Sequence, residues 1–223
     1  MNNNKTHQLV NDGIYHIISR SIARFTIFND KNDYVRMIQL LRFYQLKNPP
    51  TKYSMFLRQK GVEMLGFDIY FRKVKKDYEK LVEIIAYCLM PNHIHLVLKQ
   101  LRGKGISIFM KNILDSYTRY FNLLHKRKGP LWESRFKHIL VETDEQLFHL
   151  TRYLHLNATS ANLVSKPELW KYSSYSEYTV SSDNLLTRRE GSIDISYKEY
   201  KKFVNDHKDY QQRLAIIKKI IEI

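Results

Sequence analysis

The pattern of apolar and polar positions predicts four β-strands. Runs of β-branched, aromatic and other apolar residues are typical of strands, and they cover residues 14–19, 80–90, 93–99 and 137–141. Pro91 and Asn92 form a turn between the second and third runs, because proline cannot donate in a ladder and asparagine favours turns. We therefore expect these two strands to pair antiparallel at the centre of a sheet.

Apolar residues three and four positions apart predict amphipathic helices over residues 34–46 and 106–124. The order is then strand, helix, two strands, helix, strand, which indicates an α+β fold. Residues 48–80 contain a Pro-Pro pair and two glycines, and we expect an insertion or a mobile excursion there. Beyond a boundary at Ser181, residues 196–220 predict a charged helical tail.

A further helix is predicted to begin directly after Thr143, whose hydroxyl forms a capping box with Gln146. Along this helix His149, Tyr153 and Asn157 recur every four residues, so they lie on one face. Any amphipathic helix has a polar face. The pattern alone therefore does not make Tyr153 a nucleophile.

Two histidines stand at the start of the third predicted strand. His93 and His95 are two positions apart, and such residues point to the same face of a strand. A pair of neutral imidazoles is the beginning of a divalent-metal site, but two ligands are too few to hold an ion. The alternative is a solvated or hydrogen-bonded strand face. A metal site would need a third ligand from elsewhere in the chain.

The charge balance favours a polyanionic partner. The 223 residues include 37 Lys and Arg against 22 Asp and Glu, which gives a formal net charge of +15. Such an excess favours nucleic acid through counterion release, although a merely basic protein is the alternative. The 16 tyrosines and 11 phenylalanines offer rings for stacking on bases, while many of them must be core. The expected DNA-binding cations are Arg20, Arg24, Lys126, Arg127, Lys128, Arg135 and Lys137.

The single cysteine, Cys88, lies in an apolar run and suits a reducing compartment. No apolar stretch approaches the length needed to cross a bilayer, so we expect no membrane association. The expected location is cytoplasmic, and nucleoid-associated when the protein is bound to DNA.

Six blocks of sequence, taken together, resemble the IS200-like, single-tyrosine transposases of the HUH class, and within them the REP-associated tyrosine transposases. The resemblance covers roughly residues 10–180. The blocks are Tyr15-His16-Ile17 with Arg20, Phe28-Asn29-Asp30 with Asp33, residues 87–98, Gly129-Pro130-Leu131-Trp132 with Arg135-Phe136, residues 152–157, and Trp170 with Ser173-Ser174-Tyr175.

The resemblance implies a ferredoxin-like or RRM-like antiparallel sheet with helices packed on one face and a C-terminal helical extension, the central strand holding both histidines. It also implies that Tyr153, rather than Tyr117 or Tyr120, is the catalytic nucleophile. Asn157 occupies the place of a glutamine that ligates metal in related enzymes. His93, His95 and Asn157 would then hold a divalent metal, Mg²⁺ or Mn²⁺.

The activity that the resemblance implies is cleavage and rejoining of single-stranded DNA beside a REP-like hairpin through a covalent phosphotyrosine. Two alternatives stay open: a domesticated hairpin-binding protein with little or no cleavage, and a metal-dependent phosphodiesterase without a covalent step. Relatives include monomers and dimers, which leaves a homodimer open.

The expected domains are a catalytic domain over residues 1–180, with 48–80 as an insertion, and a helical tail over 181–223. Ala158 and Asn162 depart from the proline and glycine common in the family.

Overall fold

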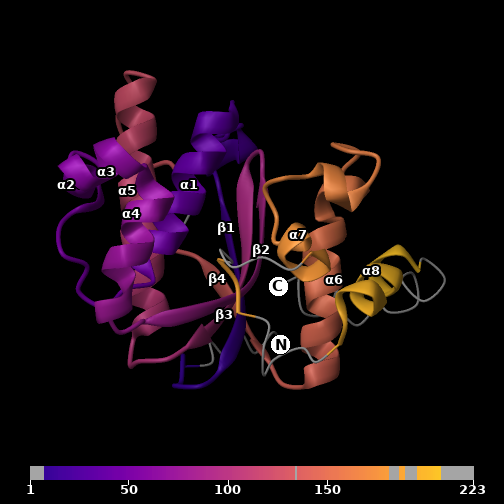
Figure 1. The fold of residues 1–223 in the computed structure, drawn as a ribbon. Coiled ribbons are helices and arrows are strands. Elements are labelled where there is room, and N and C mark those ends of the chain that lie inside the picture. Colours follow the sequence, from indigo (N-terminus) through magenta and orange to yellow (C-terminus); the bar gives the residue numbers. More distant parts are fainter. Residues whose placement is uncertain (1–7, 134, 181–185, 189–194, 207–223) are drawn as a thin grey trace.

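The protein is built around a four-stranded antiparallel sheet. The computed structural model describes residues 8–133, 135–180, 186–188 and 195–206. Its strands are β1 (Ile14–Arg20), β2 (Val82–Met90), β3 (His93–Gln100) and β4 (Lys137–Val141). Their order across the sheet is β2-β3-β1-β4, and every neighbouring pair is antiparallel (Figure 1). The α+β prediction is confirmed, and β3, which carries His93 and His95, is a central strand.

The predicted hairpin of β2 and β3 is present, but its expected position at the centre of the sheet is wrong for β2, which is an edge strand. The long apolar run of β2 has another cause, because the segment around Ser173 covers its open edge. Leu89 N–H donates to Tyr172 O at 2.9 Å, and Ser174 N–H donates to Tyr87 O at 3.0 Å. An apolar run therefore indicates burial, which an edge strand acquires when another segment covers it.

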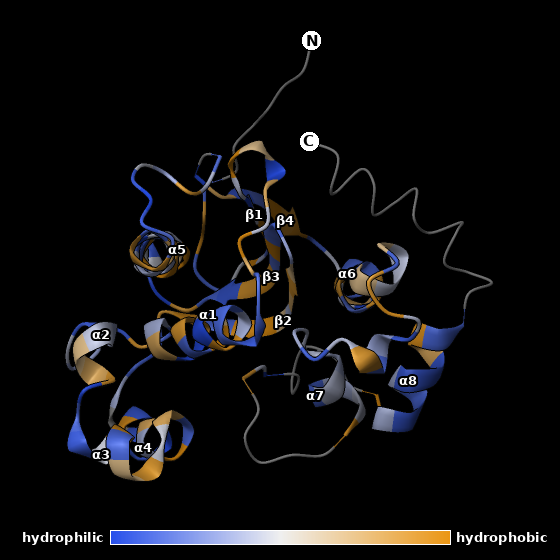
Figure 2. Ribbon diagram, turned by 90° about the horizontal axis from the view of Figure 1, so that it is seen from above, coloured by the Kyte–Doolittle hydropathy of each residue, from blue (hydrophilic) through white to orange (hydrophobic). Residues whose placement is uncertain are grey.

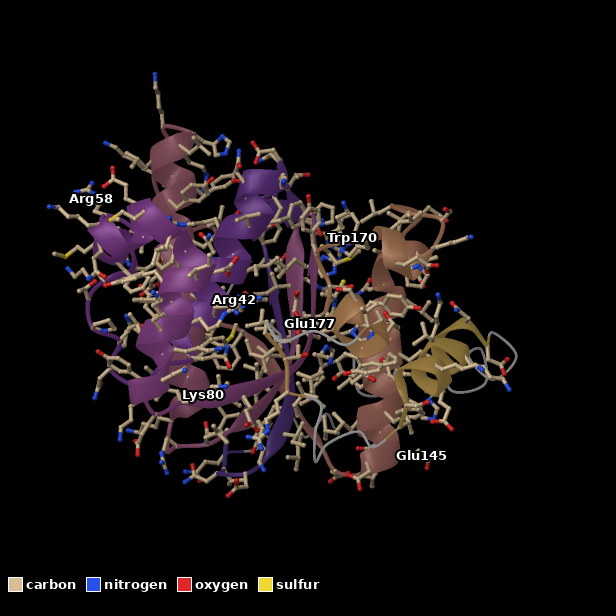
Figure 3. All side chains as sticks on the ribbon, viewed as in Figure 1. Arg42, Arg58, Lys80, Glu145, Trp170 and Glu177 are labelled. Carbon is tan, nitrogen blue, oxygen red and sulfur yellow. The ribbon has the colours of Figure 1, made fainter. Side chains whose placement is uncertain are left out.

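Trp170 belongs to this covering segment. Its indole N–H donates to Leu89 O at 3.1 Å, and its ring packs edge-on against Tyr34 with centroids 5.8 Å apart. Trp170 and Glu177 both lie beside the sheet, on the side of the C-terminal helices (Figure 3). Glu177 accepts a hydrogen bond from Tyr87 Oη at 3.4 Å and another from Thr187 N–H at 2.8 Å. These contacts join the later part of the chain to β2.

The helices form two layers, one on each face of the sheet (Figures 1 and 2). On one face lie α1 (Lys31–Tyr44) and α5 (Gly105–Leu124), which pack against each other. On the other face lie α6 (Asp144–Ser160), α7 (Tyr175–Thr179) and α8 (Tyr197–Asn205). The expectation of helices on one face thus describes α1 and α5, while the C-terminal helices add a third layer. Three single turns of 3₁₀ helix complete the path at Ile22–Arg24, Lys75–Asp77 and Pro167–Leu169.

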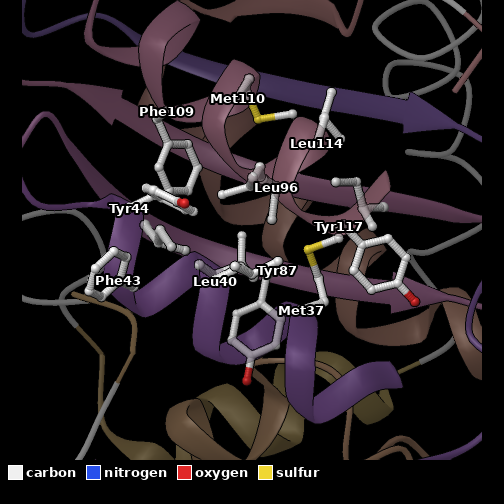
Figure 4. Packing of buried hydrophobic residues seen from close by; sticks show 14 of the residues in the cluster. Met37, Leu40, Phe43, Tyr44, Tyr87, Leu96, Phe109, Met110, Leu114 and Tyr117 are labelled. Atoms are coloured by element: carbon white, nitrogen blue, oxygen red, sulfur yellow. The ribbon is translucent and has the colours of Figure 1, made fainter. Parts of the chain in front are cut away.

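Each face of the sheet has its own hydrophobic core, because successive residues of a strand point to opposite sides. Leu96 of β3 packs between Met37 and Leu40 of α1 and Met110 of α5 (Figure 4). On the other face Val97, the next residue along β3, packs in the core formed with α6 and α8. Val97 therefore shares its side of the sheet with His93 and His95.

Residues 48–80 form three short helices whose aromatic rings are buried. They are α2 (Tyr53–Phe56), α3 (Lys60–Leu65) and α4 (Phe67–Val74). Phe67 and Phe71 are stacked at 5.3 Å, and both pack with Phe56 against Phe43 or Tyr53. The segment lies between α1 and β2 and has a packed aromatic core, so the expectation of a mobile excursion is wrong for these helices, while an insertion stays a prediction.

The predicted start of α6 is confirmed, because Thr143 Oγ1 accepts a hydrogen bond from Gln146 N–H at 3.1 Å. Within the predicted tail, α8 begins at a capping box of Ser196 and Glu199. The boundary predicted at Ser181 and the tail beyond Asp206 lie outside the described residues. Among the helices that the structure describes, none is both long and apolar enough to span a bilayer.

Candidate active site on the histidine face

The two histidines of β3 lie side by side on the face of the sheet that α6 covers. Their ring centroids are 4.9 Å apart, and their planes meet at 82°. His95 is 2% exposed, whereas His93 is half-buried at the start of the strand. Between them Ile94 points into the opposite core. The alternation that the sequence predicted is therefore present.

Both rings are held through Nδ1. The Nδ1–H of His93 donates to Asn92 Oδ1 at 2.6 Å. Nδ1 of His95 is hydrogen-bonded to Nε2 of His16 at 3.1 Å. In the described part of the chain, the Nε2 atoms of His93 and His95 have no hydrogen-bond partner. Metal-binding histidines are commonly oriented in this way, with one nitrogen anchored and the other directed at the ion.

Both imidazoles are neutral at pH 7. Burial, followed by the charges of Arg20 and Arg24, lowers the pKa of His93 to about 4. Burial, with His16 and His93 as further causes, lowers the pKa of His95 well below its ordinary value. Burial alone lowers the pKa of His16 to about 3. A neutral imidazole keeps the lone pair that a metal ion requires.

Helix α6 brings Tyr153 to this pair of histidines. The Tyr153 ring lies edge-on to the His95 ring, with centroids 5.9 Å apart and planes at 87°. Asn157 follows one helical turn later on the same face of α6. Its Nδ2 atom is buried and has no hydrogen-bond partner among the described residues. The phenol and the amide that the sequence placed on one stripe are thus carried by the helix that covers the histidines.

The tyrosines of α5 lie on the opposite face. Tyr117 is buried and donates to Ile27 O at 2.6 Å, and Tyr120 donates to Asp33 Oδ1 at 2.9 Å. Burial raises the pKa of Tyr120 to about 12. Both phenols are therefore occupied as hydrogen-bond donors away from the histidine face.

An open pocket of about 170 Å³ adjoins His93, and its other lining residues are Arg20, Arg24 and Asn92. Arg20 is the direct partner of His93 across β1 and β3. Asn92 Nδ2 donates to Arg24 O at 2.9 Å, which ties the β2–β3 turn to the loop after β1. In that loop Ala23 and Arg24 both have positive φ, 52° and 56°, a strained conformation that clusters at functional sites.

The other predicted DNA-binding cations lie on loops that meet this one, except Lys137, which begins β4. Arg127 lies over the ring of Phe25 at 5.3 Å, next to Arg24 in the chain. Ile22 N–H donates to Leu131 O at 3.0 Å, so the loop preceding β4 also adjoins the end of β1. Lys126, Lys128, Arg135 and Lys137 are exposed. The structure thus gathers the predicted basic loops around one end of β1.

Arg127 itself has structural contacts, because its guanidinium donates to Asn122 Oδ1 at 3.0 Å and to Pro130 O at 2.7 Å. Lys137 is opposite Ile18, which is opposite His95, so Lys137 is on the histidine face. The residue that sequence reasoning missed is His16. No local pattern in residues 14–19 indicates this contact, because only the pairing of β1 with β3 shows that His16 meets His95.

Within the residues that the structure describes, no group of three or more His, Cys, Asp or Glu side chains is arranged to hold a metal ion. A metal ion beside His93 and His95 would therefore need a ligand of another kind. The amide of Asn157 is a group of this kind, because a carboxamide oxygen can bind hard divalent cations.

Comparison with known proteins defines the class. The family model described as "Transposase IS200 like" matches residues 9–157, and the chain belongs to this family. A similar curated protein is "Putative REP-associated tyrosine transposase" of Haemophilus influenzae, 26% identical over 103 residues. That match covers 42% of this chain and 58% of the relative, so the two correspond over little more than half of the relative's length.

A solved structure titled "Structure of the REP associates tyrosine transposase bound to a REP hairpin" has a similar fold. The TM-score is 0.53 at 14% sequence identity, and the match covers 88% of this chain and 96% of that chain. This likeness covers a larger share of the chain than the family match over residues 9–157 does.

Proposed function

We propose that this protein is a metal-dependent endonuclease and transposase that cuts and rejoins single-stranded DNA beside a hairpin through a covalent phosphotyrosine at Tyr153. The observation that carries the proposal is the edge-on contact of Tyr153 with His95, with ring centroids 5.9 Å apart. A nucleophile must lie next to the groups that stabilise the reacting phosphate. Membership of the IS200-like transposase family supports the same assignment.

The proposed metal ligands are Nε2 of His93, Nε2 of His95 and the amide oxygen of Asn157. The fit rests on two neutral imidazoles anchored at Nδ1 and on the buried amide nitrogen of Asn157, which has no hydrogen-bond partner in the described chain. An amide can turn to present its oxygen at that position. The preferred ion is Mg²⁺ or Mn²⁺, which when bound would polarise the scissile phosphate and neutralise charge on its oxygens.

In the proposed reaction, the phenol oxygen of Tyr153 attacks phosphorus and its proton is lost. The Tyr153 O–P bond forms as the bond to the 3′ oxygen of the departing strand breaks, and that oxygen ends as a 3′-OH. Attack by a 3′-OH on the phosphotyrosine reverses these changes and releases Tyr153. Because the bond energy is kept in the phosphotyrosine, rejoining needs no nucleotide cofactor.

The basic loops around the end of β1 would bind the DNA backbone. Arg20 and Arg24 line the pocket beside His93, so a phosphate bound by them would lie next to the histidine pair. Positive charge in such loops is suited to phosphate contact. The similar solved structure is of a protein bound to a REP hairpin, which supports a folded hairpin with flanking single strand as the partner and hence a nucleoid location.

A second candidate function is hairpin binding with little or no cleavage. The observation that favours it is that the basic loops converge at the end of β1 through contacts that do not involve Tyr153. A protein could therefore keep its DNA surface after losing the chemistry. A phosphodiesterase without a covalent step is a third, weaker candidate.

The deciding experiment incubates end-labelled single-stranded DNA containing a hairpin with Mg²⁺ or Mn²⁺ and resolves the products on a denaturing gel. The wild-type protein should form a protein–DNA adduct, and Tyr153→Phe should form none, with cleavage reduced at least ~10³-fold because the nucleophile is removed. Tyr120→Phe is the matched control, since it removes a phenol of the opposite face.

Cleavage retained in Tyr153→Phe would contradict the covalent mechanism. Hairpin binding by the wild-type protein without any cleavage would favour the second candidate. Size-exclusion chromatography of the same samples tests whether the protein is a monomer or a homodimer.

A further inference from the structure

Among the residues that the structure describes, His16 is a fully buried histidine that contacts His95, and the proposed reaction has no role for it. It lies on β1 opposite Val97, while His95 lies opposite Ile18, so the two histidines are diagonal neighbours across β1 and β3. Nε2 of His16 is 3.1 Å from Nδ1 of His95, and the two ring planes are 17° apart. The rings are thus aligned for a hydrogen bond between nitrogens.

A hydrogen bond between two neutral imidazoles has two possible directions. If His16 donates from Nε2, then Nδ1 of His95 accepts and the proton of His95 is on Nε2, where it blocks metal binding. If His95 donates from Nδ1, its Nε2 carries a lone pair. A neutral imidazole has one N–H and one acceptor nitrogen, so the direction of this bond decides which nitrogen of His95 can bind a metal ion.

The neighbouring histidine shows how the second arrangement is built. Asn92 Nδ2 donates to Arg24 O at 2.9 Å, which fixes the orientation of the Asn92 amide. Its Oδ1 atom can only accept, so the proton of His93 is on Nδ1 and the lone pair is on Nε2. A site in which both histidines bind one ion needs the same tautomer in His95.

We propose that His16 is a positioning residue that accepts the Nδ1–H of His95 and thereby keeps Nε2 of His95 unprotonated for metal. This inference rests on the metal site proposed above. His16 is too far inside the sheet to meet DNA, because it is 0% exposed. Its effect on the reaction passes entirely through His95.

The proposed arrangement determines which nitrogen of His16 carries its proton. When its Nε2 accepts, its own proton is on Nδ1, and that atom is buried without a hydrogen-bond partner in the described chain. An unpaired buried donor destabilises the fold. An apolar residue of similar size would avoid this loss, so His16 is poorly explained as a filler of volume. A positioning role predicts that His16 lowers the stability of the fold and is nevertheless the residue at this position.

The test compares three substitutions of His16. His16→Gln places an amide near the position of Nε2 and can still accept from His95. His16→Asn carries the same amide on a shorter side chain that does not reach, and His16→Leu removes hydrogen bonding altogether. For each full-length protein three quantities are measured: the tautomer of His95 by ¹⁵N NMR without metal, the affinity for Mn²⁺ by titration calorimetry, and the stability in urea.

In the wild-type protein and His16→Gln, His95 should carry its proton on Nδ1. His16→Leu and His16→Asn should bind Mn²⁺ about 10- to 100-fold more weakly, the range typical for loss of a residue that orients a metal ligand. His16→Leu should nevertheless be as stable as the wild-type protein without metal, or more so. A merely structural role predicts the opposite, lower stability with unchanged affinity for Mn²⁺.

A proton on Nε2 of His95 in the wild-type protein, or equal Mn²⁺ affinity in all three variants, would overturn the inference about His16. If the wild-type protein binds no Mn²⁺ while His95 is protonated on Nδ1, the proposed metal site fails and the orienting contact stands. The two failures are therefore distinguishable.

Discussion

His95 and His155 are both buried histidines at the α6 face of the sheet, and they differ in how their ring nitrogens are used. His155 uses both: Nδ1 is hydrogen-bonded to Tyr200 Oη and Nε2 to Ser174 Oγ, each at 2.7 Å. His95 has a hydrogen bond at Nδ1, and Nε2 has no hydrogen-bond partner in the described chain. Burial lowers the pKa of both, so burial does not separate their roles.

A structural histidine has hydrogen-bond partners at both ring nitrogens, whereas a histidine that can bind a ligand has one nitrogen without a partner. Hydrogen bonding, rather than burial, separates the two kinds. His155 joins three helices, because Tyr200 is on α8 and Ser174 directly precedes α7. Ser174 Oγ also accepts from Tyr87 N–H of β2 at 2.9 Å, and Tyr200 donates to Thr151 Oγ1 at 2.9 Å. This network holds α6, and hence Tyr153, on the histidine face.

The largest predicted effect is that of His93→Ala on cleavage. Removing one of the two imidazoles should lower metal-dependent cleavage about 10³-fold, equivalent to roughly 4 kcal/mol on the barrier. The free energy of unfolding should change little, because His93 is at the partly exposed start of β3. Cleavage is measured with the hairpin substrate and stability in urea. The control is His138→Ala, on the other face of the sheet. Equal losses of cleavage in His93→Ala and His138→Ala would contradict a special role of the histidine face.

The next effect concerns stability. His155→Leu should lower the free energy of unfolding by about 2–4 kcal/mol, because two hydrogen bonds are lost and two buried hydroxyl groups lose a partner. Tyr200→Phe, which removes one hydroxyl of the same network, should cost about 1–2 kcal/mol. Both are measured by urea denaturation at pH 7. A neutral His155→Leu substitution would show that the network is dispensable, and the comparison would then fail.

The smallest effect is the change in stability over one pH unit, between pH 6 and pH 5. Burial lowers the pKa of His155 to about 3 in the folded protein from its ordinary value of 6.5. As the pH falls below 6.5 the unfolded chain binds a proton that the folded chain does not, so stability is lost on the way down to about pH 3. His155→Leu should reduce this slope by about 1.4 kcal/mol per pH unit. An unchanged slope between pH 6 and pH 5 would mean that His155 titrates normally when folded.

The features that the sequence predicted well are those encoded within one element. The alternation of His93 and His95, the capping box at Thr143 and the four-residue spacing of Tyr153 and Asn157 are all local, and each is present in the structure. Helical and extended periodicity therefore suffice to say which side chains share a face.

What the sequence did not predict depends on pairing between distant segments. His16 meets His95 only through the register of β1 against β3, and β2 acquires its covered edge only from residues near Ser173. The helices of residues 48–80 were missed because they are short and are stabilised by aromatic packing on Phe43 rather than by a long periodic stripe. Such tertiary contacts have no local pattern.

The hydrogen bond between His16 and His95 joins residues that are 79 positions apart in the chain. Contacts of such wide separation form only after a long loop has closed, which delays them during folding. His16 and His95 therefore meet only when β1 has paired with β3. A chain in which β1 and β3 have not yet paired therefore lacks the proposed active site.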